Sequence, residues 1–126
     1  METLMIAPPA PGNPPAPPVN VNGMPLGFDI GGQNGLRPAT VADFQALKRA
    51  GKIFGIIKVS EGARDPEFLA RYPMVRDGGL IRGVYDLFFP MNVNDEVNLV
   101  VNNVPRLTPG DLAPSLDLED KIVTIG

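Results

Sequence analysis

The stretch "IFGIIKVS" (residues 53–60) is apolar at almost every position. A strand that shows one face to water alternates apolar and polar residues, whereas a strand of a parallel sheet is covered on both faces and reads as a continuous apolar run. Helical patterns precede and follow this stretch, as they do around the strands of βαβ units. The stretch therefore predicts an α/β fold built on a parallel sheet.

The segment before this strand has the pattern of a helix. "VADFQALKRAG" (residues 41–51) follows Thr40, and Asp43 stands three residues later, at the spacing of an approximate capping box. Gly51 is a typical stop, because glycine tolerates the left-handed conformation that ends many helices. We therefore predict a helix between Thr40 and Gly51.

Two further helices are predicted downstream. "DPEFLARY" (residues 65–72) starts with Asp65 as a cap and Pro66 at the first helical position, and Pro73 is expected to kink or end that helix. "NDEVNLVVNNV" (residues 94–104) predicts the third helix. Its inward-facing residues are expected to be Val97, Val100, Val101 and Val104.

Three more strands complete the pattern: "LGFDI" (residues 26–30), "LIRGVYDLFF" (80–89) and "PSLDL" (114–118). The predicted order is βαβαβαβ, with four strands and three helices. Right-handed crossovers put all the helices on one side if the sheet curls. We therefore predict an incomplete TIM-type (β/α) barrel over residues 24–126, preceded by a disordered Pro-rich tail or linker over residues 1–23.

Composition excludes several classes of function. The formal net charge is -3, so no basic field is expected to hold nucleic acid or an anionic membrane. The chain has no Cys and no His, and we expect no metal, no cofactor and no disulfide. No stretch reads as a signal peptide or approaches the roughly 20 apolar residues that span a bilayer. Acid–base chemistry near neutral pH would therefore fall to carboxylates.

Three carboxylates are predicted to converge at the carboxyl ends of the strands. Alternation along the last strand points Leu116 and Leu118 to the helices and Asp117 and Glu119 to the barrel axis, where Asp29 of the first strand also points. Like charges this close cannot all ionise cheaply, so one carboxyl stays protonated as an acid while another stays anionic, as glycoside hydrolysis requires. The alternative is that these are ordinary polar residues at strand ends.

The order and spacing of several segments resemble the family 25 glycoside hydrolases, lysozymes of the muramidase type. These segments are "GFDIGGQNG", "DFQALKRAGKIFGIIKVSEG", "DPEFLARY", "GLIRGVYDLFFP" and "LTPGDLAPSLDLED". The resemblance covers the N-terminal half of that family's fold. It implies hydrolysis of the β-1,4 bond between N-acetylmuramic acid and N-acetylglucosamine in peptidoglycan glycan strands.

The resemblance also implies roles for particular residues. Glu119 takes the place of the general acid, Asp117 supports the charge that develops at the anomeric carbon, and Asp29 matches the active-site acid of the first strand. Glu61 and Tyr85 match substrate-binding positions in the groove. Lys58 is expected with them among the substrate-binding residues, as an ion-pair partner that lowers the pKa of a neighbouring acid, or alternatively in a salt bridge of the barrel interior.

The chain also departs from the family pattern. Gly31 and Gly32 stand where the family carries larger side chains that wall the groove, and Asp86 follows Tyr85 where the family has His. The strands that close the family's barrel are missing. Three hypotheses follow: a muramidase, a catalytically inactive half-barrel that binds cell-wall glycan or a protein partner, and a half-barrel that self-associates through its open edges.

Overall fold

The computed structural model describes residues 23–32 and 37–119. Along the chain the elements are β1 (Gly27–Ile30), α1 (Val41–Arg49), β2 (Phe54–Ser60), α2 (Phe68–Asp77), β3 (Ile81–Leu87), α3 (Val93–Asn103) and β4 (Ser115–Asp117). These four strands and three helices occur in the predicted order. The predicted Pro-rich tail lies outside the described residues, apart from Gly23.

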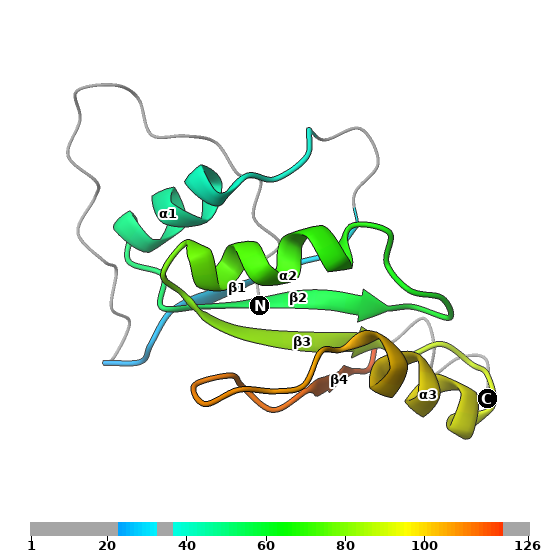
Figure 1. Ribbon diagram of the computed structural model, residues 1–126. Helices are drawn as coiled ribbons and strands as arrows, with labels where there is room; N and C mark the ends of the chain where they lie inside the picture. The colour runs from blue at the N-terminus through cyan, green and yellow to red at the C-terminus, as the bar shows by residue number, and fades with distance from the viewer. Residues whose placement is uncertain (1–22, 33–36, 120–126) are drawn as a thin grey trace.

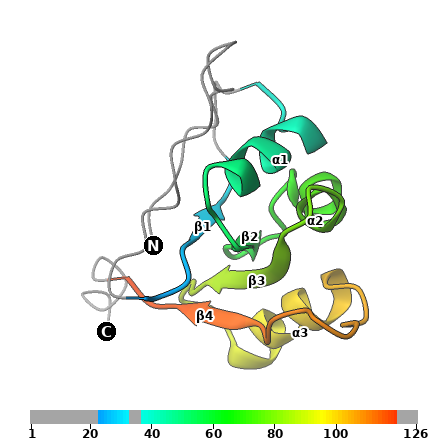
Figure 2. The same cartoon turned by 90° about the vertical axis from the view of Figure 1, so that its left-hand side faces the viewer.

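The four strands form one parallel sheet in the order β1-β2-β3-β4 (Figure 1). The three helices lie on the same side of this sheet (Figure 2). This arrangement confirms the predicted α/β character and the placement of the helices on one side. It is the order of four consecutive strands of a barrel, and closure into a barrel stays a prediction.

The main core lies between the sheet and the helices. Phe28 of β1 stacks on Phe44 of α1 with ring centroids 6.0 Å apart, and both side chains are buried. Phe68 of α2 and Val59 of β2 are also fully enclosed. Because burying each such side chain contributes about 1.5–3 kcal/mol, this layer holds α1 and α2 on the sheet.

A second cluster covers the opposite face of the sheet. Ile56, Tyr85 and Leu87 are each 8% exposed, and Phe54 and Leu112 pack against them. Strand β2 thus contributes apolar side chains to both faces, which explains why its sequence does not alternate.

The N-terminus of α1 is capped as the sequence indicates. The Thr40 amide donates to Asp43 Oδ2 at 2.9 Å. The Arg37 guanidinium contributes two further hydrogen bonds to the same carboxylate, at 2.6 and 2.7 Å, and it lowers the pKa of Asp43 to about 2. Arg37 was not predicted as a partner.

Helix α2 differs from the prediction, because it continues through Pro73 to Asp77. A proline inside a helix removes one backbone hydrogen bond, and burial of Tyr72 and Val75 on either side of Pro73 stabilises the continued helix. Of the two predicted outcomes, an end at Pro73 is therefore wrong, and a kink at Pro73 stays a prediction. In the part of the chain that the structure describes, none of the helices has the length and apolar character needed to cross a membrane.

The predictions for apolar residues at the edge of the sheet are partly wrong. Val97 and Val101 of α3 were expected to face inward, but they are 52% and 66% exposed. Leu116 and Leu118 are 59% and 65% exposed, although they were expected to be covered by helices. The reason is that α1 and α2 cover β1 to β3, whereas Leu116 of the edge strand borders an open apolar groove along α3.

Candidate functional site

The predicted acids lie at the carboxyl ends of β1 and β4. Phe28 and Ile30 are buried under the helices, so the Asp29 side chain between them belongs to the opposite face of the sheet. Asp117 is the last residue of β4 and pairs with Leu87, and Glu119 follows two residues later. The acids therefore lie on the face expected from alternation.

Tyr85 of β3 lies on the same face of the sheet as these acids. Burial raises its pKa, and the negative charges of Asp29, Asp117, Asp65 and Glu119 raise it further. Because the charges of all four carboxylates raise the pKa of this one phenol, the four carboxylates lie near Tyr85. The structure thus brings together the three predicted acids and Tyr85, and it adds Asp65.

Asp29 occupies an unusual position for a carboxylate. Its Oδ1 atom is buried and has no hydrogen-bond partner among the described residues. Burial raises the pKa of Asp29, and the nearby Asp117 carboxylate adds to the effect. A carboxyl in this environment holds its proton more tightly than one in water, as enzymes of acid–base type require.

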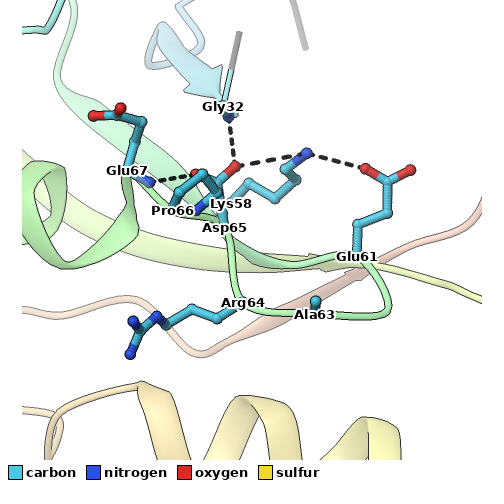
Figure 3. A pocket seen from close by; sticks show the side chains of 8 residues that line it. All are labelled: Gly32, Lys58, Glu61, Ala63, Arg64, Asp65, Pro66 and Glu67. Carbon is cyan, nitrogen blue, oxygen red and sulfur yellow. Dashed lines mark hydrogen bonds and ion pairs between the residues drawn. The ribbon is translucent and has the colours of Figure 1, made fainter. Parts of the chain in front are cut away.

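A polar cavity of about 280 Å³ lies between Gly32, Lys58 of β2 and the loop before α2 (Figure 3). Lys58 reaches across it and contacts two carboxylates, Glu61 Oε2 at 3.0 Å and Asp65 Oδ2 at 3.6 Å. Glu61 is exposed, whereas Asp65 is buried. Lys58 therefore forms ion pairs with Glu61 and Asp65, two partners that the sequence analysis did not name. No group of three or more acids in the described segments has the arrangement of a metal site.

Two residues that the sequence analysis did not assign to the site hold the chain segment after Asp29. The buried Arg71 side chain donates from Nη1 to the Gly31 carbonyl at 2.6 Å. The buried Asp65 carboxylate accepts from the Gly32 amide at 2.5 Å and from the Glu67 amide at 2.8 Å.

Helix α2 begins at Phe68 with Glu67 as its N-cap, so the predicted cap at Asp65 and the predicted first helical position at Pro66 are wrong. Asp65 acts instead as a positioning residue, which ties the turn before α2 to the segment after β1. Because Asp65 precedes a helix, the sequence analysis assigned it as a cap and did not predict its contact with Gly32.

Gly31 and Gly32 lie where neighbouring side chains leave little room for a Cβ atom. A Cβ atom on Gly31 would lie 3.1 Å from Lys58 Cε and 3.2 Å from Tyr85 Oη. A Cβ on Gly32 would lie 2.8 Å from Asp65 Oδ2. Side chains of β2, β3 and the loop before α2 therefore fill the space around the two glycines.

The Asp65→Asn variant is expected to lower the free energy of unfolding by about 1–3 kcal/mol, because an amide can accept fewer of the hydrogen bonds that the buried carboxylate accepts and leaves Lys58 with one partner fewer. Urea denaturation measures the loss. Glu67→Gln, two residues away and half-buried, is the control and should change stability by less than about 0.5 kcal/mol. Equal losses in both variants would contradict the positioning role of Asp65.

Asp86 points away from the acids, because side chains alternate along β3 and its neighbour Tyr85 lies on their face. An irregularity in the pairing of β2 and β3 places Ser60 opposite Asp86, and the Ser60 hydroxyl donates to Asp86 Oδ1 at 2.7 Å. Asp86 is 4% exposed and faces Glu96 of α3. It therefore has partners on the helix side and lies outside the candidate site.

The chain is similar in structure to a family 25 glycosyl hydrolase from Bacillus anthracis, with a TM-score of 0.60 over 71% of this chain. The likeness is one of fold. The aligned residues are 21% identical and span 40% of the length of that protein. No protein-family model and no curated protein matches the sequence.

Proposed function

We propose that this protein is a glycoside hydrolase of the lysozyme type, an N-acetylmuramidase. Its substrate is peptidoglycan, and it cuts the β-1,4 bond between N-acetylmuramic acid and N-acetylglucosamine. The observation that carries the proposal is the convergence of Asp29, Asp117 and Glu119 on Tyr85 at the carboxyl edge of a parallel sheet. The fold shared with a family 25 glycosyl hydrolase and the sequence motifs described above support it.

In the proposed reaction, Glu119 donates a proton to the glycosidic oxygen as the bond to the anomeric carbon breaks. Asp117 remains anionic and stabilises the positive charge that develops on the sugar ring. Water then bonds to the anomeric carbon and returns a proton to Glu119, which completes the hydrolysis. Asp29, whose pKa is raised by burial, contributes a carboxyl that need not be ionised beside them. The three groups thus supply an acid and an anion in one site.

The glycan strand is proposed to lie along the same face of the sheet. Tyr85 offers an aromatic ring and a hydroxyl, and Lys58 and Glu61 flank the polar cavity. The domain that binds the strand is proposed to comprise residues 24–126, with the Pro-rich tail as a spacer. The domain is proposed to be part of a (β/α) barrel, and the edges of its sheet are proposed sites of self-association.

Incubating the folded chain with purified peptidoglycan tests the function directly. A muramidase releases fragments with N-acetylmuramic acid at the new reducing end, which mass spectrometry of the released muropeptides identifies. The comparison is a variant with all three carboxyls neutralised, Asp29→Asn, Asp117→Asn and Glu119→Gln, which is expected to release none. Ends that carry N-acetylglucosamine would contradict the proposed bond.

A catalytically inactive, glycan-binding protein is the second candidate, and the short span of the structural likeness favours it. Sedimentation with insoluble peptidoglycan separates the two. Binding without release by a chain that circular dichroism shows to be folded supports the inactive form. If the folded chain neither binds peptidoglycan nor releases fragments from it, both candidates are overturned.

A further inference from the structure

Two carboxyl side chains are buried together where α3 meets the sheet. Asp86 of β3 and Glu96 of α3 are 4% and 7% exposed. The Ser60 hydroxyl donates to Asp86 Oδ1 at 2.7 Å, and the Phe89 amide donates to Glu96 Oε1 at 3.0 Å. The pair lies on the helix side of the sheet, opposite the face that carries the candidate active site.

No described cation neutralises this pair. The ion pairs among residues 23–32 and 37–119 involve neither carboxylate. Ser60 of β2 is neutral, and so are the residues of β4 that border the adjoining groove. On α3, Asp95 is exposed, and Arg64 of the loop after β2 hydrogen-bonds to Asn103 near the other end of the helix. The pair therefore faces neutral groups and each other.

Two carboxyls in such a place share one proton more easily than they ionise together. Burial raises the pKa of Asp86 to about 6, and the charge of Glu96 and a hydrogen bond to it act in the same direction. When Asp86 is protonated, its hydroxyl donates to Glu96 while the other oxygen accepts from Ser60. Every hydrogen-bonding atom of the contact is then satisfied.

This contact holds the N-terminal half of α3, whereas Val100 and Val104 pack against the main core at its other end. Glu96 is the buried residue of the helix, whereas Val93, Val97 and Val101 are all more than half exposed. Through the Phe89 amide, Glu96 also holds the segment between β3 and α3. The Phe89 ring in turn lies against Gly62, next to Glu61 of the polar cavity. Loss of the Asp86–Glu96 contact would therefore affect both α3 and the loop that carries Glu61.

We propose that Asp86 and Glu96 form a proton-dependent latch, which holds α3 and residues 88–92 on the sheet when one carboxyl is protonated and releases them when both are ionised. The sign follows from linkage: a pKa that is raised on folding contributes stability below the ordinary value near 4, and this contribution is lost as the pH rises through about 6. Asp43 and Asp111, whose pKa values are lowered by arginine, have the opposite sign and lose their contribution only below about pH 4.

Amide hydrogen exchange between pH 4.5 and 7.5, corrected for the intrinsic rate, tests the latch. The protection factors of the α3 amides and of Phe89 are expected to fall on the order of 10- to 100-fold over this range in the wild type. Amides in the centre of β2 should change several-fold less. The carbon resonance of the Asp86 carboxyl should titrate in the same interval.

The Asp86→Asn variant is expected to abolish the pH dependence, because an amide at this position donates to Glu96 and accepts from Ser60 at every pH. Glu96→Gln should act in the same way from the other side, and it provides a second test if the first variant fails to fold. Asp95→Asn, which removes the neighbouring exposed charge of α3, is the control and should keep the wild-type response. Constant protection of α3 in the wild type, or an unchanged pH dependence in both amide variants, would overturn the latch.

Discussion

The Glu119→Gln variant is expected to release muropeptides roughly 10²- to 10⁴-fold more slowly than the wild-type chain. An amide of the same shape cannot donate the proton that the leaving glycosidic oxygen requires, while binding of the glycan should change little. The loss should therefore appear in kcat rather than in KM. This expectation rests on the proposed muramidase function and on the position of Glu119 among the acids around Tyr85.

Rates of reducing-end formation on peptidoglycan measure this effect. The matched control is Asp77→Asn, an exposed carboxylate at the end of α2, on the edge of the sheet where β3 begins. It should retain the wild-type rate. Equal activity of Glu119→Gln and the wild type would exclude Glu119 as the acid, even if the chain cleaves the glycan.

Replacing Asp111 by alanine is expected to lower the free energy of unfolding by about 2–3 kcal/mol, since hydrogen bonds to charged groups are among the stronger ones and three arginine N–H donors would lose their acceptor. Asp111 accepts from Arg82 Nε at 2.9 Å, from Arg82 Nη2 at 3.1 Å and from Arg76 Nη2 at 2.7 Å. The Arg82 guanidinium is 10% exposed and also stacks over the Tyr72 ring at 4.0 Å. Its charge would remain in place without a carboxylate partner.

Urea denaturation of Asp111→Ala at pH 7 tests this expectation, with Asp77→Ala as the exposed control. The difference between the two should shrink as the pH falls below 4. The reason is that Arg82 lowers the pKa of Asp111, so the contribution of the pair is present above the ordinary carboxyl pKa and disappears when the carboxylate is protonated. A decrease in the free energy of unfolding below about 0.5 kcal/mol at pH 7 would contradict the prediction, because it would mean that water stabilises Arg82 as well as Asp111 does.

Much of the candidate site could be predicted from the order of residues along single strands. Because side chains alternate in a strand, the burial of Phe28 and Ile30 places Asp29 on the other face, whatever the rest of the chain does. Parallel strands then bring their carboxyl ends to one edge, where Asp117 and Tyr85 also lie. Asp65 could not be assigned to the site in this way, since its contact with Gly32 joins residues 33 positions apart.

The sequence by itself determined the α/β class, the order of four strands and three helices, and the face on which the acids lie. These features depend on apolar runs, caps and alternation, which act over a few residues. Only the tertiary structure decided that α2 continues through Pro73, that Asp86 has Ser60 and Glu96 as partners, and that Arg71 holds Gly31. The physical reason is range: Ser60 and Asp86 are 26 residues apart and Gly31 and Arg71 are 40 apart, so these contacts exist only once the layers have packed.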